Sequence, residues 1–158
     1  MNTEAILHDF YSAFAEENAD RMVTYYTDET VFSDPAFGTL KGPRAMAMWQ
    51  MLMERSKGQL QIEYEIAEAN TGTGVVRWQA DYPFGPDKRR VINHVTSRLI
   101  LENGKIIRHA DSFSFGKWSR QALGLPGLLL GWTPFMQKAV QKKTGKLLSR
   151  YMEKHNPE

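Results

Sequence analysis

The stretch LILENGKIIRHAD, residues 99–111, places Asn103-Gly104 between two runs rich in aliphatic residues. Asn-Gly in this setting is a strong signal for a two-residue β-hairpin turn. The turn sets the register of the strands on either side of it, beginning with Glu102 opposite Lys105. Counting back from it predicts three further cross-strand pairs: Arg98 with His109, Thr96 with Asp111, and His94 with Phe113.

Side chains alternate between the two faces of a strand, so these six residues are expected on one face of the hairpin. That face would gather two histidines, an arginine and an aspartate beside an aromatic ring. The other face is apolar, with Val91, Val95, Leu99, Leu101, Ile106 and Ala110. We expect the polar face to line the inside of the protein and the apolar face to be covered by a second subunit.

The chain before the hairpin predicts helices first and strands afterwards. Apolar residues at helical spacing indicate helices over 3–17, 19–26 and 43–57, with Thr3 as an N-cap, Asn18 as a left-handed C-terminal residue and Pro43 in the first turn. A short strand is expected within ETVFSDPAFGTLKG, residues 29–42, and long strands over 59–70, 75–82, 91–102 and 105–115. Segregated helices and strands indicate the α+β class.

The chain after the hairpin is apolar and then basic. A helical turn over 117–123 is followed by LPGLLLGW, residues 125–132, and by a helix that begins near Thr133-Pro134. Residues 1–104 carry 10 Lys/Arg and 15 Asp/Glu, whereas residues 105–158 carry 10 Lys/Arg and 3 Asp/Glu. We expect an appended amphipathic helix with a solvated basic face. The apolar stretch could act as a lid, pack on a partner or lie on a membrane, and the membrane is the disfavoured alternative.

Composition limits the classes of function. A chain of 158 residues without cysteine fits one domain and excludes thiol nucleophiles and cysteine-ligated metal. No apolar run is long enough for a membrane span, and the start lacks the basic region of a signal peptide. A cytoplasmic protein is expected. No aromatic-interleaved basic patch or glycine-rich phosphate loop is present, so we expect neither nucleic acid nor a nucleotide cofactor as a partner.

The order of elements, the segment TYYTDETVFSDPAFG and the hairpin ending in RHAD resemble the nuclear-transport-factor-2-like superfamily, over about residues 3–115. Within it, the chain is most similar to SnoaL-like polyketide cyclases and ketosteroid isomerase. The resemblance implies a cone-shaped, curved antiparallel sheet of the cystatin-like kind, wrapped around the N-terminal helices and a hydrophobic pocket. It also implies a homodimer through the outer sheet face. Residues 1–116 would form this SnoaL-like unit, with 117–158 as a helical extension of the same domain.

The ketosteroid isomerase pattern places its general base at Asp34, before Pro35, and a pocket tyrosine at Tyr26. Its two oxyanion donors fall on Phe10 and Thr96, with Tyr11 one position away from the first. Neither residue is the usual donor, and one oxyanion donor typically contributes a rate factor of about 10²–10³. Steroid isomerisation by the usual mechanism is therefore not expected.

The SnoaL-like cyclases use an acid–base Asp seven residues after the hairpin Gly, with a His two residues before it, and Asp111 and His109 match this spacing from Gly104. The resemblance implies Asp111 as the first choice for the general acid or base, with His109 and His94 as polarising or proton-shuttling neighbours. A third relative, limonene-epoxide hydrolase, uses an Asp–Arg–Asp set, for which Asp34, Arg98 and Asp111 are the matching residue types. The expected pocket lining is aromatic apart from one threonine: Phe10, Phe14, Tyr26, Phe32, Trp49, Trp78, Thr96 and Phe113.

Two classes of function remain open. The first is an enzyme that performs acid–base chemistry, as an isomerase, cyclase, dehydratase or epoxide hydrolase, on a small hydrophobic molecule. The second is a non-catalytic domain that binds such a molecule. Structural roles compete at each position: Asp34 as a turn residue, Arg98 as an ion-pair partner of Asp111, and the histidines as hydrogen-bonded rim residues. The histidines and carboxylates lack a short-range metal motif, so we expect no metal and no other cofactor.

Overall fold

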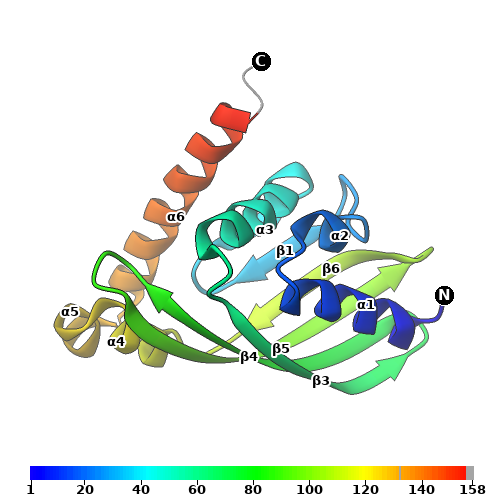
Figure 1. Ribbon diagram of the computed structural model, residues 1–158, viewed down its shortest axis with the longest axis horizontal. Coiled ribbons are helices and arrows are strands. Elements are labelled where there is room, and N and C mark those ends of the chain that lie inside the picture. Colours follow the sequence, from blue (N-terminus) through cyan, green and yellow to red (C-terminus); the bar gives the residue numbers. More distant parts are fainter. Residues whose placement is uncertain (132, 156–158) are drawn as a thin grey trace.

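The computed structural model describes residues 1–131 and 133–155 (Figure 1). Trp132, the last residue of the expected apolar stretch, lies outside the described residues. The elements in chain order are α1 (Thr3–Ala15), α2 (Ala19–Val23), β1 (Val31–Asp34), β2 (Gly38–Lys41), α3 (Pro43–Ser56), β3 (Gln61–Asn70), β4 (Thr73–Phe84), β5 (Arg89–Glu102), β6 (Lys105–Ser112), α4 (Phe115–Leu123), α5 (Leu125–Leu130) and α6 (Pro134–His155).

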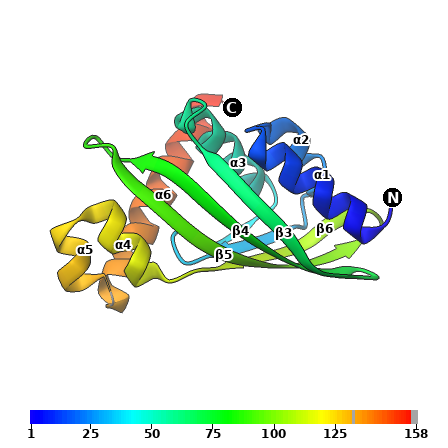
Figure 2. The ribbon, with the colours of Figure 1, turned by 60° about the horizontal axis from the view of Figure 1, so that its bottom comes forward.

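The strands form one curved six-stranded sheet in the order β2-β1-β6-β5-β4-β3. Helices α1, α2 and α3 cover its concave face, and α4 lies beside the first residues of β5, with α5 next to α4 (Figure 2). This confirms the α+β class and the curved sheet around N-terminal helices. The sheet is mixed rather than wholly antiparallel, because β1 pairs with β6 in parallel. The segment expected to hold one short strand forms the antiparallel pair β1 and β2.

The first two helices end earlier than predicted, at Ala15 and Val23, and the capping and left-handed residues of α1 each lie one position before the predicted ones. The side chain of Asn2, not Thr3, caps α1 by accepting from the Ala5 amide. The left-handed residue after α1 is Glu17, and Asn18 instead caps α2 by accepting from the Arg21 amide. Both asparagines accept from the amide three residues ahead, which is the usual N-cap geometry.

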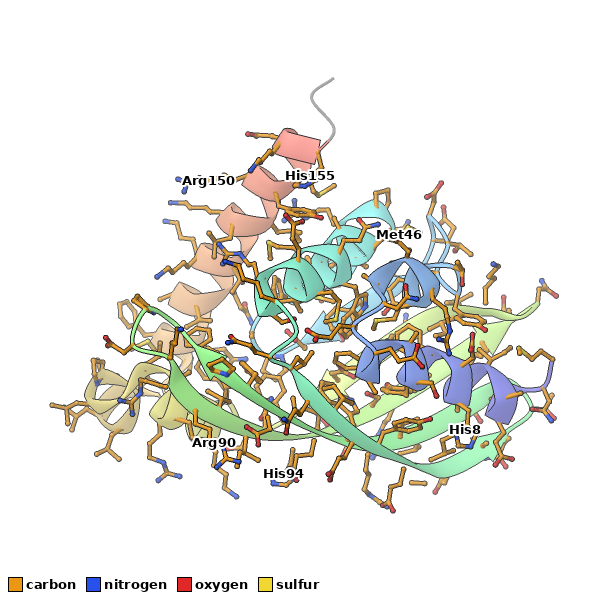
Figure 3. All side chains as sticks on the ribbon, in the orientation of Figure 1. His8, Met46, Arg90, His94, Arg150 and His155 are labelled. Carbon is orange, nitrogen blue, oxygen red and sulfur yellow. The ribbon has the colours of Figure 1, made fainter. Side chains whose placement is uncertain are left out.

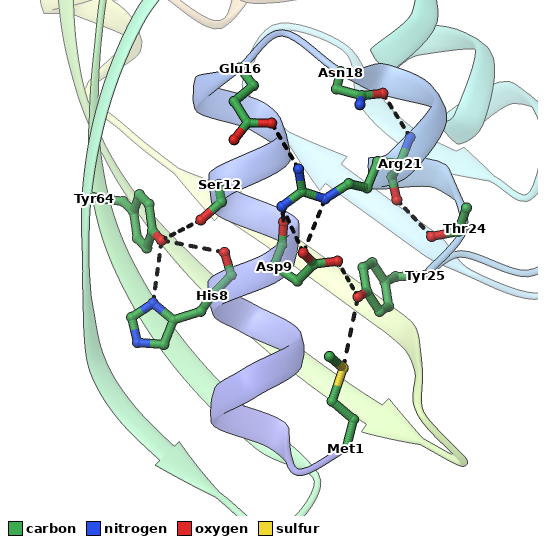
Figure 4. Close-up of polar contacts among 10 residues, drawn as sticks. All are labelled: Met1, His8, Asp9, Ser12, Glu16, Asn18, Arg21, Thr24, Tyr25 and Tyr64. Atoms are coloured by element: carbon green, nitrogen blue, oxygen red, sulfur yellow. Dashed lines mark hydrogen bonds and ion pairs between the residues drawn. The ribbon is translucent and has the colours of Figure 1, made fainter.

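A cluster of polar side chains fixes α1 against α2 and the strand β3 (Figure 4). Arg21 donates to Asp9 Oδ1 from both Nε, at 3.0 Å, and Nη2, at 2.6 Å, and Tyr25 donates to the other carboxylate oxygen. These partners hold the pKa of Asp9 below its ordinary value. On the other side of α1, the Tyr64 hydroxyl lies 3.0 Å from that of Ser12.

The hairpin turn is confirmed, but the register beyond it is shifted by one residue. Asn103 and Gly104 have φ of 51° and 76°, and Glu102 pairs with Lys105 as expected. An irregularity follows, because Leu101 pairs with Ile106 whereas Ile100 pairs with Arg108, which leaves Ile107 out of the ladder. An extra residue of this kind moves every later side chain of the strand to the other face.

Because of the shift, the predicted residues of β6 lie on the opposite face of the sheet from the predicted residues of β5. His109 lies opposite Leu99 and Asp111 opposite Ser97, and all four side chains are buried. The prediction that His109 pairs with Arg98 was wrong. The apolar face, with Val91, Val95, Leu99, Leu101 and Ile106, is the inner one, so the expectation that it faces a second subunit was also wrong. The homodimer through the outer face stays a prediction that the resemblance implies, without the apolar surface that was expected to support it.

The C-terminal helices α4 and α6 pack against α3 and the ends of β4 and β5. Helix α6 packs beside α3, with Leu148 fully buried and Arg44 donating to Ser149 at 3.2 Å (Figure 1). Thr133 caps α6 as predicted, accepting from the Met136 amide. At the other end, a second apolar cluster joins α4 and α6 to the ends of β4 and β5: Val91, Phe115, Trp118 and Ala122, with Tyr82, Phe84, Phe113, Leu123, Met136 and Val140 against them.

Candidate functional site

Asp34 and Asp111 are brought together by the parallel pairing of β1 and β6. Phe32 pairs with His109 in this ladder, and both side chains are buried. Two residues further along each strand, on the same face, stand Asp34 and Asp111. Adjacent strands are about 4.8 Å apart, so the two carboxylates are close neighbours. The last two inward positions of this strand pair thus carry acidic groups.

The carboxylate of Asp111 is held through one oxygen. Its Oδ1 accepts from the Ser97 hydroxyl and lies 2.9 Å from Nε2 of His109. Ser97 in turn accepts from Nε1 of Trp78 at 2.7 Å. Among the described residues no side chain or amide donates to Oδ2 of Asp111. The arrangement fixes the orientation of the carboxylate and leaves one oxygen open to a ligand.

His109 is fully buried and its two ring nitrogens have different partners. Nδ1 lies 2.8 Å from the Tyr26 hydroxyl, which accepts from Nε1 of Trp49 at 2.9 Å. Because the Tyr26 oxygen receives that hydrogen, its own hydrogen is free to bond Nδ1, and Nε2 then carries the hydrogen that faces Asp111. The donors therefore run in one direction, from Trp49 through Tyr26 and His109 to Asp111. The rings of Phe10, Phe32 and Trp49 pack around the imidazole, with centroids 5.2–6.0 Å away.

Asp34 forms the turn predicted for an Asp-Pro sequence, and its carboxyl group has a raised pKa. Its Oδ1 accepts from the amides of Ala36 at 2.9 Å and Phe37 at 2.6 Å. Burial raises the pKa of Asp34 to about 7, and the charge of Asp111 adds to the rise, against the opposing effects of the two amides and His109. At neutral pH this carboxyl is present in both its protonated and ionised forms.

Tyr82 reaches the site from β4. Its hydroxyl accepts from Nε1 of Trp118 at 2.9 Å, and among the described residues no group accepts the hydroxyl's own hydrogen. Burial raises the pKa of Tyr82 to about 12, and the charge of Asp34 contributes to that rise. Tyr82 therefore stays protonated as a hydrogen-bond donor near Asp34. The acids thus lie between the main core and the second apolar cluster, to which Tyr82 belongs.

Helix α6 holds the turn that carries Asp34. Gln137 and Gln141 both donate to the carbonyl oxygen of Pro35, at 3.2 and 3.1 Å, and Thr144 donates to that of Ala36 at 2.9 Å. These three residues recur at helical spacing on one face of α6. The C-terminal extension is therefore part of the support of the site rather than an independent appendage.

The structure brings together most of the predicted site residues. Asp34, Asp111, His109 and Tyr26 form one cluster, and the aromatic residues Phe10, Phe14, Phe32, Trp49 and Trp78 pack in the adjoining core. Phe113 lies in the second cluster. One surface hollow is lined by Gln59, Asp81 and Tyr82, and another by Glu16 and Tyr151, and neither is lined by Asp34 or Asp111. The expected pocket among these aromatic side chains stays a prediction.

Three predicted residues lie apart from the site. His94 and Arg98 are exposed on the convex face of the sheet, and Thr96 lies between them on that face. Figure 3 shows His94 pointing away from the helices. The shifted register is the cause, because His109 and Asp111 face inward while the even-numbered residues of β5 face outward. Placing His94 and Arg98 in the site was therefore wrong, and no Asp34–Arg98–Asp111 set is assembled.

Sequence reasoning missed Tyr11, Ser97 and Tyr82. Tyr11 is fully buried, with its hydroxyl 3.4 Å from Nε2 of His109, and its spacing of four residues from Leu7 is the signal for that position. Ser97 alternates with the buried Val95 and Leu99, which indicates an inward serine. The described residues contain no group of three His, Asp or Glu side chains arranged to hold a metal ion.

Comparison with known proteins gives a family and a fold. The SnoaL-like domain family matches residues 7–109. A search of curated protein sequences gave no significant match.

Several solved structures share the fold. An LEH-like epoxide hydrolase of M. tuberculosis has a TM-score of 0.58 and 22% identity, over 79% of this chain and 92% of that chain. SalBIII, an epoxide hydrolase/cyclase-like enzyme of pyran ring formation in salinomycin, has a TM-score of 0.61 and 15% identity, over 70% and 89%. AclR, a putative hydroxylase from Streptomyces galilaeus, has a TM-score of 0.62 and 15% identity, over 81% of this chain and 96% of that chain. At these identities the likeness concerns the fold.

Proposed function

The chain belongs to the SnoaL-like domain family, and from that premise we propose that it is an enzyme of proton transfer. Its substrate would be a small hydrophobic carbonyl compound, and its reaction an isomerisation, an aldol-type cyclisation or a dehydration. One observation carries the proposal: Asp34 and Asp111 are neighbours on parallel strands, each held through Oδ1. Among the described residues, no group donates to the second oxygen of either carboxylate.

Asp34 is the better general base of the two. An efficient acid–base group has a pKa near the working pH, and the pKa of Asp34 is about 7. Its ionised form would take a proton from the carbon next to the carbonyl and return it at another position. Asp111, oriented by Ser97 and His109, keeps a negative charge beside it and thereby raises its affinity for the proton.

The developing enolate oxygen needs a hydrogen-bond donor, and Tyr82 supports that role best. Its oxygen is already engaged by Trp118, so its hydrogen is available to a ligand close to Asp34. A preorganised donor of this kind typically contributes a factor of about 10²–10³ in rate. Hydrolysis of an epoxide receives less support, because Arg98 lies on the convex face.

The test is solvent exchange, which needs no knowledge of the natural substrate. The protein is incubated in D₂O with small ketones that have acidic neighbouring protons, such as 2-tetralone and cyclohex-3-enone, and deuterium incorporation is followed by NMR. Exchange above the buffer rate is expected, with a loss of about 10²–10⁴-fold in Asp34→Asn. The exposed Asp87→Asn is the matched control and should keep full activity.

Two results would contradict the proposal. Exchange that persists unchanged in Asp34→Asn would remove this residue as the base. Buffer-level exchange with every ketone, together with tight binding of one of them, would instead make the protein a non-catalytic binding domain.

A further inference from the structure

Helix α5 buries its glycines and exposes its leucines, the reverse of an ordinary amphipathic helix. Gly127 and Gly131 lie against Ser119 of α4, and a methyl group at either position would collide with that residue. The close approach of α5 to α4 thus depends on these two small residues, four positions apart. The larger side chains of the helix are left on its remaining surface.

Five large apolar side chains are exposed within residues 125–135, at one end of the protein. Leu125 is 66% exposed and Phe135, at the start of α6, is 75% exposed. Leu128, Leu129 and Leu130 are exposed as well. Apolar side chains gathered in this way mark an interaction site rather than ordinary surface variation. Of the alternatives for this stretch, a lid receives no support from the described residues, because the leucines are exposed.

The surroundings of this apolar surface are basic. Residues 112–152 contain seven Lys/Arg and no Asp or Glu. On α6, Lys138, Lys142 and Lys146 follow Phe135 at helical spacing, so the four side chains share one face, and all are exposed. We call the five exposed apolar residues and these three lysines the α5–α6 surface.

We propose that the α5–α6 surface binds the headgroup region of an anionic phospholipid bilayer, with α5 and Phe135 inserted and the lysines on the phosphates. Leucine and phenylalanine beside a basic helical face are typical of helices that lie in the membrane interface. A second copy of the chain fits less well, because it would bring two sets of like charges together. No helix of the described residues is long and apolar enough to cross a bilayer, so the contact is with the surface.

The test is sedimentation of the full chain with vesicles. Vesicles of phosphatidylcholine alone are compared with strongly anionic vesicles that contain about 30 mol% phosphatidylglycerol. Binding is expected to the anionic vesicles and should weaken as salt is added. Lys138→Gln with Lys142→Gln should lower the partition coefficient roughly 30-fold, and Leu128→Ser with Phe135→Ser should abolish binding.

Matched variants separate a specific surface from general stickiness. Lys41→Gln with Lys57→Gln removes the same charge elsewhere, and Ile100→Ser removes an exposed apolar side chain of β5; both should bind like the wild type. The substituted residues are exposed, so thermal unfolding should be unchanged. The proposal is overturned if neither vesicle binds, if both vesicles bind equally, or if Leu128→Ser with Phe135→Ser leaves binding intact. It is also overturned if that double variant converts a stable dimer into a monomer without any lipid binding.

Discussion

His109 and Asp111, two residues apart on β6, face the same way and share a hydrogen bond of 2.9 Å between Nε2 and Oδ1. Because Nδ1 of His109 is bound by Tyr26, the imidazole cannot turn, and it fixes the carboxylate in one orientation. The carboxylate of Asp111 is thus held in a fixed position beside Asp34 on the neighbouring strand. The readiness of Asp34 to hold a proton at neutral pH rests partly on this relationship.

Replacement of Asp34 by Asn should stabilise the protein at neutral and alkaline pH. An unfolded Asp has a pKa near 3.9. Since the folded pKa is about 7, the folded state binds the proton more tightly, and the stability of the wild type falls as pH rises from about 4 to 7. With about 1.4 kcal/mol per pKa unit, Asp34→Asn should exceed the wild type by up to about 4 kcal/mol at pH 8 and match it near pH 4. Urea unfolding at both pH values measures the difference, and a constant gap would contradict the prediction.

Replacement of Ser97 by Ala should lower the free energy of unfolding. The substitution leaves Nε1 of Trp78 without its acceptor and removes one donor from Asp111, which should cost about 1–3 kcal/mol. The control is Ser112→Ala, at an exposed serine on the neighbouring strand, which should change the free energy of unfolding by less than about 0.5 kcal/mol. Equal effects in chemical denaturation would show that the buried network does not stabilise the fold.

Replacement of Thr144 by Val should loosen the Asp34 turn without touching Asp34. The hydroxyl of Thr144 donates to the Ala36 carbonyl, and the Ala36 amide donates to Asp34. Loss of one hydrogen bond of about 1 kcal/mol should speed hydrogen exchange of the Ala36 and Phe37 amides about fivefold. Lys143→Gln, one residue earlier and exposed, should leave both rates unchanged. Unaltered exchange in Thr144→Val would mean that α6 does not hold the turn.

Replacement of Gly127 by Ala should separate α5 from α4. The added methyl group meets the Ser119 backbone, and overpacking of this kind costs about 1–3 kcal/mol. Gly145→Ala is a stringent control, because its methyl group meets nothing and the better helix former should add up to about 1 kcal/mol on α6. Opposite changes in melting temperature are expected, and a stable Gly127→Ala would contradict the close packing of the two helices.

The sequence predicts the element order well because its signals are local. The Asn103-Gly104 turn, the apolar stripes of the helices and the Asp-Pro turn all form where their residues indicate. Asp34, Asp111, His109 and Tyr26 were predicted and do come together. These positions depend on which element a residue belongs to, and that is encoded by neighbouring residues.

The irregularity at Ile107 was not predictable from the sequence. Ile106 and Ile107 suit a strand equally well, so nothing in their chemistry shows which one leaves the ladder. A shift of one residue exchanges the two faces, and it moved Arg98 out of the site while it brought Ser97 in. The hydrogen bonds from α6 to the Asp34 turn were equally unpredictable, since they join residues more than 100 positions apart.

The acid–base role of the site depends on the raised pKa of Asp34, which burial and the charge of Asp111 produce. A ¹³C NMR titration of the Asp34 side chain measures this pKa directly. The midpoint should lie near pH 7 in the wild type and fall in Asp111→Asn, because that variant removes a neighbouring negative charge. A midpoint near pH 4 that does not change in Asp111→Asn would contradict the coupled pair, and with it the acid–base role of the site.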